Sequence, residues 1–410
     1  MATYQRGDKK IYGMTIPENM KSTNLKPERK NAWEVGLDWR FLDSRIGVDL
    51  TYYKENTRNQ IMTINVPWES GVKEKLINAG NIQNSGIEIA LNTTPIKKKQ
   101  WQWDLNFTYT RNRNKIVELS PDVTSYINLD GAANYGNYRI ASVAKVGSDY
   151  GMLMSDSWIK TDEKTGKPVV GYTNKFRTVY YKRGGTVKEV GSMLPNFLGS
   201  LNSTLRWKDL SLYVLFDARF GGYVASYNSR YATAYGFSGE TEKYRKGMTW
   251  TSKYANAQDK VFTDGFIPDV VFDAGTIVTT PGGTNQDVSG MTYQEAYEKG
   301  YVEPAHLQSA AYFKNSWGTG VINDDWFKKI NYIALREITL SYNVPTKISS
   351  YIGAKNLSLS FTGRNLAYLL NTAPNHENPE SVRGTGAAQF RMRSFMPYTA
   401  SYLFTLNATF

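Results

Sequence analysis

Apolar and polar residues alternate along the last stretch of the chain. From Tyr398 to Phe410 every second residue is apolar or aromatic, and most residues between them are small and polar. A period of two places these two sets on opposite faces of one extended strand. A run of this length exceeds most globular strands and suits a tilted strand that crosses about 25 Å of hydrocarbon. The pattern therefore predicts a transmembrane β-strand at 398–410.

The same alternation recurs upstream. In its clearest form, from Trp101 to Thr110, aromatic residues and leucine alternate with Gln, Asp, Asn and Thr. Each such run predicts a strand with one apolar and one polar face. We therefore expect an all-β fold, an antiparallel transmembrane barrel wall, with further strands at about 33–41, 46–52, 82–93, 101–110, 196–207, 210–220, 328–342 and 355–363.

The connections between these strands alternate between short and long. Short turns follow the first, third and fifth strands, and a connection of moderate length follows the seventh. The longest connections are 113–195 and 221–327, the second with a local helix expected around Tyr293–Gly300. Outer-membrane barrels have short periplasmic turns and longer outer loops. We therefore expect both long connections to be extracellular and the C-terminus to be periplasmic.

The number of strands indicates an incomplete barrel. Nine is odd, whereas bacterial single-chain barrels have even numbers of strands and large plugged ones have about 22. An open sheet edge is not tolerated in lipid, because its backbone groups would lack partners. We therefore expect the C-terminal part of a large plugged barrel at 33–410, preceded at 1–32 by loop or an incomplete strand. The absence of a signal peptide likewise suggests a chain that begins inside a larger protein.

Composition excludes several classes of function. No run of 18 apolar residues is present, which excludes a helical membrane protein. Cysteine is absent and histidine occurs only at His306 and His376, so we expect no metal site, no cofactor and no enzyme. The net charge of +12 is spread along the chain, which argues against nucleic acid as a partner. Aromatic residues make up 14%, and Trp101, Trp103 and Trp207 near short turns suit a periplasmic girdle.

Two sets of side chains are candidates for a functional site. The first faces away from the apolar stripes and would line a water-filled lumen, where it could pair with neighbours, guide substrate or hold a plug; its members are Asp38, Arg40, Glu88, Asp104, Asn106, Asp217 and Arg219. The second repeats every four residues, which suits either a packed helical face or a stacking platform for a sugar or peptide; its members are Tyr223, Tyr227, Tyr231 and Tyr235. Carboxylate pairs such as Asp104 and Glu88 could also be proposed for glycoside cleavage, but their spacing does not favour it.

Several segments resemble the SusC/RagA family of TonB-dependent outer-membrane transporters. They are NLKPE at 24–28, WEVGLD at 33–38, LINAGNIQNSGIE at 76–88, FDARFGG at 216–222, LREITLSY at 335–342 and GRNL at 363–366. Ala218 and Arg219 stand where this family usually has Gly and Gln. The final Phe410 resembles the C-terminal signal that barrel-assembly machinery recognises.

This resemblance implies an activity and a set of partners. The implied activity is active import of a bulky glycan or oligopeptide across the outer membrane of a Gram-negative bacterium. The implied partners are a SusD-like surface lipoprotein, outer-membrane lipid, and TonB–ExbB–ExbD acting through a plug that these 410 residues do not include. An alternative is a secreted all-β carbohydrate-binding or adhesion protein, and another is a β-rich glycosidase. Dependence on detergent would separate both alternatives from a barrel.

Overall fold

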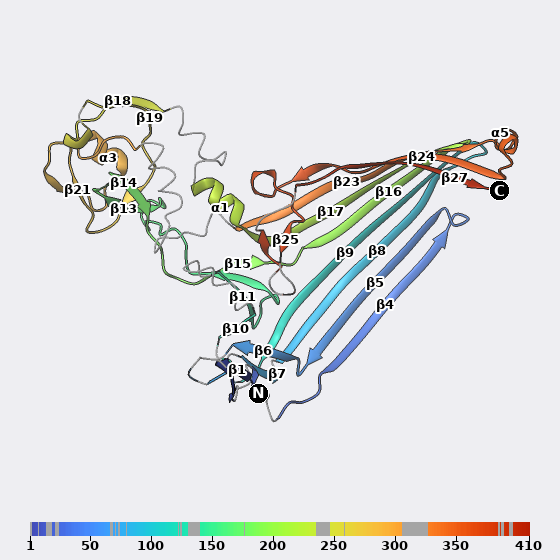
Figure 1. Ribbon diagram of the computed structural model, residues 1–410, viewed down its shortest axis with the longest axis horizontal. Helices are drawn as coiled ribbons and strands as arrows, with labels where there is room; N and C mark the ends of the chain where they lie inside the picture. The colour runs from blue at the N-terminus through green and yellow to red at the C-terminus, as the bar shows by residue number, and fades with distance from the viewer. Residues whose placement is uncertain are drawn as a thin grey trace.

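The computed structural model describes the chain except for residues 1, 7, 14–18, 21–23, 66–68, 70, 73, 79, 122, 124, 130–139, 176, 235–246, 258, 306–326, 384–385, 387–388 and 393–396. Its dominant feature is a long, curved, antiparallel sheet (Figure 1). None of the described helices is long and apolar enough to cross a membrane.

Nine strands of this sheet lie side by side in the order of the sequence. Each pairs with the long strand before it and the one after it, and β4 and β27 occupy the two edges. All nine predicted strands are therefore confirmed, as is the all-β antiparallel fold. They are β4 (Arg29–Phe41), β5 (Ile46–Arg58), β8 (Gly80–Lys97), β9 (Trp101–Leu119), β16 (Phe197–Trp207), β17 (Leu210–Ser226), β23 (Phe327–Val344), β24 (Asn356–Asn371) and β27 (Ser401–Thr409).

The register between strands keeps the apolar positions in phase. Residues directly opposite each other in an antiparallel pair share a face, and one face of the sheet is accordingly apolar from edge to edge. Because a slip of one residue would move a whole strand's apolar set to the other face, the burial preference fixes this register. The opposed pairs include Leu37 with Leu50, Val48 with Leu91, Phe107 with Leu201, Leu201 with Phe216, Leu340 with Phe361, and Phe361 with Phe404.

Aromatic side chains border this apolar face at both ends. Near the short turns, the rings of Trp101 and Trp207 stack at 5.6 Å. Near the long connections, Tyr109 lies 5.3 Å from Phe197. From Trp101 to Tyr109 the strand rises roughly 27 Å, and a tilt of about 40° reduces this to about 21 Å across the membrane. The band between the two aromatic rows is thus close to the apolar height of an outer-membrane barrel.

Several strands continue further toward the long connections than the alternation predicts. Strand β5 extends to Arg58, β9 to Leu119, β17 to Ser226 and β24 to Asn371. Beyond the apolar band the connections cover parts of these strands, as at the buried Ile116 and Leu119 of β9, so the alternation fades while the backbone pairing continues. The predicted connections at 57–81, 113–195 and 221–327 therefore begin later than expected.

The last strand is shorter than predicted. Strand β27 begins at Ser401, where the ladder to β24 starts at the pair Arg364 and Ser401. Tyr398 precedes the strand and lies with its ring 4.6 Å from that of Tyr368. The apolar stripe of this strand therefore starts at Tyr402.

Short strands occur before and between the long ones. Residues 1–32, expected as loop, contain the antiparallel pair β1 (Ala2–Arg6) and β2 (Lys9–Gly13), which flank a turn at Asp8. Further along, β3 (Asn19–Met20) pairs in parallel with β7 (Glu74–Asn78), which also pairs with β6 (Ile61–Asn65). A separate sheet contains β10 (Tyr126–Asn128), β11 (Ile140–Lys145), β12 (Met152–Ser155) and β15 (Lys188–Ser192).

The two longest connections fold together into one module, which we call the loop module (residues 158–183 and 247–305). Strand β13 (Val169–Thr173) pairs with β14 (Thr178–Tyr181) and, in parallel, with β20 (Val271–Phe272) from the other connection. The predicted helix is confirmed as α3 (Tyr293–Glu298), which begins with a capping box of Thr292 and Glu295. The module also contains β18 (Met248–Thr251), β19 (Val261–Gly265), β21 (Ile277–Thr279), β22 (Asn285–Asp287) and the 3₁₀ turn η3 (Ala255–Ala257).

The loop module has a hydrophobic core drawn from both connections. Val170 and Val179 pack against Phe272, Val278 and Tyr293, all of them almost completely buried. The ion pair from Lys160 Nζ to Asp273 Oδ1, 2.7 Å long, also crosses between the connections. The module lies beyond the long-connection end of the sheet, opposite the short turns and the C-terminus (Figure 1).

Short helices and strands lie at both the long-connection end and the short-turn end of the sheet. Helix α1 (Tyr227–Ala234) follows β17 directly, and β26 (Arg391–Met392) pairs with both β17 and β25 (Val382–Arg383). The turn between β23 and β24 holds α5 (Thr346–Ser349) and the 3₁₀ turn η4 (Ser350–Ile352), and η5 (Pro374–His376) follows β24.

Candidate functional site on the polar face of the sheet

The face opposite the apolar stripes gathers the predicted lumen residues. The register opposes Asp38 to Asp49, and Glu88 to Thr51 and Thr110. Asp217 lies opposite Ser200, and Arg219 lies opposite Leu198. With Arg40, Asp104 and Asn106, which share this face, all the predicted residues lie on the polar side of one wall. Their role in transport stays a prediction.

Charged side chains on this face pair across neighbouring strands. Arg40 contacts Asp38 at 2.5 Å and Asp49 at 2.8 Å. Arg206 Nη1 lies 3.0 Å from Asp104 Oδ2. Lys30 with Glu55 and Arg364 with Glu337 form similar pairs, at 2.6 and 2.9 Å. Most cations of the described polar face are therefore neutralised within the wall.

Asn106 extends a row of amides on the same face. Its Nδ2 donates to Asn202 Oδ1 at 2.7 Å. Eight residues further along β9, Asn114 Nδ2 donates to Asn84 Oδ1 at 2.8 Å. Amides both donate and accept hydrogen bonds, so such a row offers a polar solute partners of either kind.

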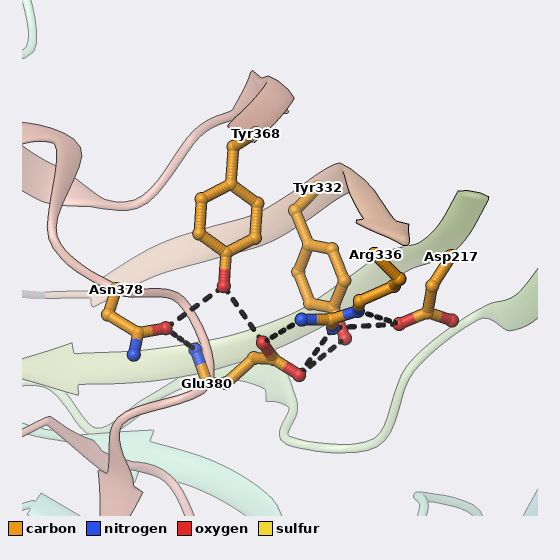
Figure 2. A network of polar contacts seen from close by, with 6 residues as sticks. All are labelled: Asp217, Tyr332, Arg336, Tyr368, Asn378 and Glu380. Atoms are coloured by element: carbon orange, nitrogen blue, oxygen red, sulfur yellow. Dashed lines mark hydrogen bonds and ion pairs between the residues drawn. The ribbon is translucent and has the colours of Figure 1, made fainter. Parts of the chain in front are cut away.

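The most connected group on the polar face is Arg336 (Figure 2). Its Nε and Nη2 donate to Asp217 Oδ2 at 3.2 and 2.8 Å. Its Nη1 and Nη2 donate to the two carboxylate oxygens of Glu380 at 2.7 and 2.6 Å. One guanidinium therefore joins the wall, through Asp217, to the connection between β24 and β27, through Glu380. Such fork-shaped contacts are among the strong hydrogen bonds in proteins.

Two tyrosines and an asparagine complete this network. The Tyr368 hydroxyl lies 2.8 Å from Glu380 Oε2 and 3.0 Å from Asn378 Oδ1. The Tyr332 hydroxyl donates to Glu380 Oε1 at 3.4 Å. Because both tyrosines come from wall strands, the connection is attached to the wall from its polar side.

The backbone attaches the same connection a second time. Ala225 N, near the end of β17, donates to Phe390 O at 2.7 Å, and β26 continues this as a parallel pair with β17. Phe390 is fully buried with Phe327 and Tyr227. We call the described residues of this connection (372–383, 386 and 389–392) the inner strap, because they lie across the polar face at the long-connection end.

Two carboxyl groups of the inner strap respond oppositely to their surroundings. Burial would raise the pKa of Glu380, but hydrogen bonds from Arg336 and Tyr368 outweigh it and lower that pKa below its usual value. Burial raises the pKa of Glu377, against the weaker effect of a hydrogen bond from Ser226. The surroundings thus stabilise the charged form of Glu380 and disfavour the charged form of Glu377.

Arg219 and the two glycines that follow it lie near the long-connection end of β17. The Arg219 guanidinium donates to the carbonyls of Gly221 and Met193, both at 3.4 Å. Gly221 and Gly222 have φ angles of 88° and 89° at the irregularity of the ladder between Phe220 and Tyr223. A Cβ on Gly221 would lie 2.7 to 2.9 Å from Asn196 atoms, so this conformation requires glycine.

The four tyrosines do not form one helical face, and that prediction is wrong. Tyr223 belongs to β17, because this strand continues to Ser226, and only then does α1 begin at Tyr227. Tyr227 is buried, and Tyr223 packs against the same cluster. These two side chains therefore pack within the protein, and a role in recognition stays a prediction. The side chain of Tyr231 and all of Tyr235 lie outside the described residues.

The loop module contains a small aromatic pocket. Trp250 stacks on Phe262 at 4.7 Å, and the Arg177 guanidinium lies 4.6 Å from the Tyr254 ring centre. Glu303 accepts a hydrogen bond from Ser252 at 2.7 Å. The pocket volume is about 20 Å³, which is room for a single water. It is therefore no preformed site for a sugar or peptide.

Sequence reasoning missed Arg336 and Glu380. Arg336 and Glu337 are adjacent charges inside an alternating strand, and this break in the alternation marks the ladder irregularity between Leu335 and Glu337. That break could have been recognised. Glu380 lies in a connection without periodicity, so only the fold reveals it. Within the described part of the chain, no cluster of His, Asp and Glu could hold a metal ion.

Comparison with known proteins places this sheet in a family. The family described as "TonB dependent receptor-like, beta-barrel" matches residues 3–223, more than half of the chain. The chain belongs to this family. Its membership identifies the sheet as part of a TonB-dependent receptor barrel and places it in the outer membrane of a Gram-negative bacterium.

Individual relatives point to the SusC/RagA type of TonB-dependent receptor. TonB-dependent receptor P26 of Formosa agariphila is 23% identical over 363 residues, covering 86% of this chain and 31% of P26. TonB-dependent receptor SusC of Bacteroides thetaiotaomicron is 29% identical over 171 residues, covering 41% of this chain and 17% of SusC. The chain thus spans about a third, or less, of the length of these relatives.

Solved structures show the same fold. The RagAB peptide importer in its "closed-closed" state matches with a TM-score of 0.59 at 15% identity, over 93% of this chain and 35% of that chain. Its "open-open" state matches with the same TM-score over 94% of this chain. The nine-stranded sheet of this TonB-dependent receptor therefore corresponds to about a third of a longer barrel-containing chain.

Proposed function

We propose that the chain supplies part of the barrel wall and outer loops of a SusC/RagA-type transporter that imports a bulky nutrient, a glycan or an oligopeptide. The observation that carries this proposal is the two-faced sheet of a TonB-dependent receptor. Its apolar face suits lipid, and its opposite face is lined with charged and amide groups. The similarity to a peptide importer supports the oligopeptide class, and the glycan class rests on the resemblance of the sequence motifs to the SusC/RagA family.

The short turns face the periplasm in this proposal, and the loop module faces the outside. The support is the length rule of outer-membrane barrels together with the module's position beyond the long-connection end. The C-terminus, at the short-turn end, is then periplasmic, and Phe410 meets the barrel-assembly machinery during insertion.

The loop module is the proposed contact for a SusD-like surface lipoprotein. It has a packed core of its own, and its pocket is too small for a bulky substrate, which suits a protein-binding surface better than a substrate site. The polar face beneath it is the proposed path of the substrate. TonB–ExbB–ExbD would act on a plug domain outside these 410 residues.

Uptake in living cells tests the proposal. A strain lacking the full gene should lose growth on one class of substrate, offered as sole carbon source from panels of glycans and oligopeptides. The wild-type gene should restore it, and a proton uncoupler should abolish uptake of the labelled substrate. Growth of the deletion strain on every substrate at the wild-type rate would contradict the transport proposal.

Co-purification tests the partner. Mild detergent extraction of the tagged transporter should retain a surface lipoprotein, and a variant without residues 247–305 should lose it while remaining in the outer membrane. Retention of the lipoprotein by that variant would show that the loop module is not the contact. A soluble, secreted protein would instead favour the alternative of a carbohydrate-binding or adhesion protein.

A further inference from the structure

We propose that the lipid-facing side of β4, β5, β8 and β9 carries a binding site for the phosphate groups of the glycolipid in the outer leaflet. The feature is a row of cations just beyond the aromatic border of the apolar face, which we call the basic belt. Its members are Arg29, Lys54, Arg58, Arg111, Arg113 and Lys115.

The ladder register places the basic belt on the lipid side. Tyr52 lies opposite Ile87, and Ile87 opposite Arg111. One step further from the short turns, Trp33 lies opposite Lys54, Lys54 opposite Ser85, and Ser85 opposite Arg113. The ladders have no irregularity in this stretch, so these cations share the face of Trp33, Tyr52 and Ile87.

The height of the belt matches that of lipid headgroups. The rings of Trp33 and Tyr52 lie 5.3 Å apart and belong to the aromatic row at the long-connection end. Such rows mark the boundary between hydrocarbon and headgroups. Arg111 and Arg113 follow Tyr109 along β9, so they lie where headgroup phosphates begin.

The cations of the belt differ from those of the polar face in their partners. The polar face pairs Lys30, Arg40 and Arg206 with carboxylates. By contrast, no member of the belt forms an ion pair with a described carboxylate. Among the described residues, the one acidic residue on that face of the belt stretches is Glu118, which lies across Asn81 from Arg58. Arg29 even lies directly opposite Arg58. Two positive charges directly opposite each other destabilise a sheet unless an anion lies between them.

A groove adjoins the densest part of the belt. It has a volume of about 590 Å³, a size typical of ligand sites. Arg111, Arg113 and Lys115 line it together with amide and hydroxyl side chains, and Asp149 is the one carboxylate among its lining residues. Cations surrounded by neutral donors suit a phosphorylated sugar headgroup, because the guanidinium fork binds phosphate and the amides bind hydroxyls.

Outer-leaflet glycolipid is the occupant that charge and position favour. It carries phosphates on a sugar headgroup and faces the outside, where the long connections lie in the proposed orientation. The inference rests on that orientation and not on any transported substrate. Failure of the uptake experiment would therefore leave it standing, and failure of the lipid experiment would leave the transport proposal standing.

The experiment is a titration of the full-length transporter in detergent micelles with bisphosphoryl lipid A, monitored by the midpoint of thermal unfolding. The test variant is R111Q/R113Q/K115Q. The matched control is K97Q/K98Q/K99Q, which removes the same charge at the short-turn end of β8 and β9. We expect wild type and control to bind alike and the test variant to bind at least about tenfold more weakly, because each cation near an anionic surface contributes to affinity.

Other ligands distinguish the source of the phosphate. Dephosphorylated lipid A, inorganic phosphate and phosphatidylglycerol should each raise the midpoint less than bisphosphoryl lipid A does. Equal binding of the test variant, or an equal effect of any of these three ligands, would overturn the proposal. If the test variant does not fold, R113Q and a salt series on the wild type replace it. Binding that is unchanged in R113Q and insensitive to salt would overturn the proposal too, since exposed charges are screened at high ionic strength.

Discussion

At the scale of single residues, Arg336 has the largest consequences. Its side chain is 18% exposed and contacts carboxylates that are 37% and 38% exposed, so water screens the network only in part. Removing one partner from such a network leaves the others charged and desolvated. The network thus holds the inner strap to the wall.

Replacing Arg336 with Met should lower the free energy of unfolding by about 2 kcal/mol, less than for a fully buried pair. Unfolding in detergent, followed by heat-modifiable gel migration, measures this. Proteases should also cut the inner strap faster. The matched control is Arg364→Met, because Arg364 is 54% exposed and pairs with Glu337 alone. An equal loss in both variants would contradict the special role of Arg336.

The stability that the inner strap contributes should depend on pH through Glu380. Its pKa is lowered in the folded state, so its contribution to stability is present above the unfolded pKa and is lost as pH falls through the lowered value. Glu380→Gln should therefore destabilise the protein near neutral pH and have little effect in strong acid. Unfolding midpoints measured across a pH series test this.

Glu377 should behave in the opposite sense. Its folded-state pKa is raised by burial, so its charge costs stability above that pKa, and the cost disappears once pH falls below the unfolded value. Glu377→Gln should therefore stabilise the protein near neutral pH, with a benefit that vanishes in acid. The same pH series measures both variants, and a change of the same sign in both would contradict these assignments.

At the scale of elements, the loop module is a folding unit built from two connections. Phe272 is fully buried at its centre, 5.5 Å from the ring of Tyr293. The sheet below is held by its own ladders, so damage to this core should stay local.

Phe272→Ala should destabilise the loop module by about 3–5 kcal/mol, the usual cost of removing a buried aromatic side chain. Amide hydrogen exchange should rise across 247–305, while the heat-modifiable migration of the barrel stays unchanged. Ile277→Ala is the matched control, because Ile277 is 53% exposed in the same module. Exchange that rises equally in both variants would argue against the module having a single core.

At the scale of the whole molecule, the two ends of the sheet should face opposite compartments. These 410 residues contain no cysteine, so single cysteines introduced among them can be compared with the unsubstituted protein as the background. Ser44 lies in the exposed turn between β4 and β5, and Lys299 is exposed in the loop module.

A membrane-impermeant maleimide added to intact cells should label Lys299→Cys and not Ser44→Cys. Permeabilising the outer membrane should make Ser44→Cys reactive as well, which controls for its accessibility. Labelling of Ser44→Cys alone in intact cells would reverse the proposed orientation, and with it the assignment of the basic belt to the outer leaflet.

The sequence by itself determined the parts of the protein that touch lipid. Lipid on one side and water on the other impose an alternation of period two, so each of the nine strands could be recognised locally and the phases agree across the sheet. The shared face of Asp38, Asp104 and Asp217 follows from the same rule.

Only the tertiary structure decided where the strands end and what the connections build. Beyond the lipid the two faces no longer meet lipid on one side and water on the other, so β9 continues to Leu119 without the alternation of period two. The shared core of the loop module joins Val170 to Phe272, and the inner strap joins Arg336 to Glu380. These contacts link distant segments, and no local pattern encodes which distant partner will satisfy a buried side chain or an unpaired charge.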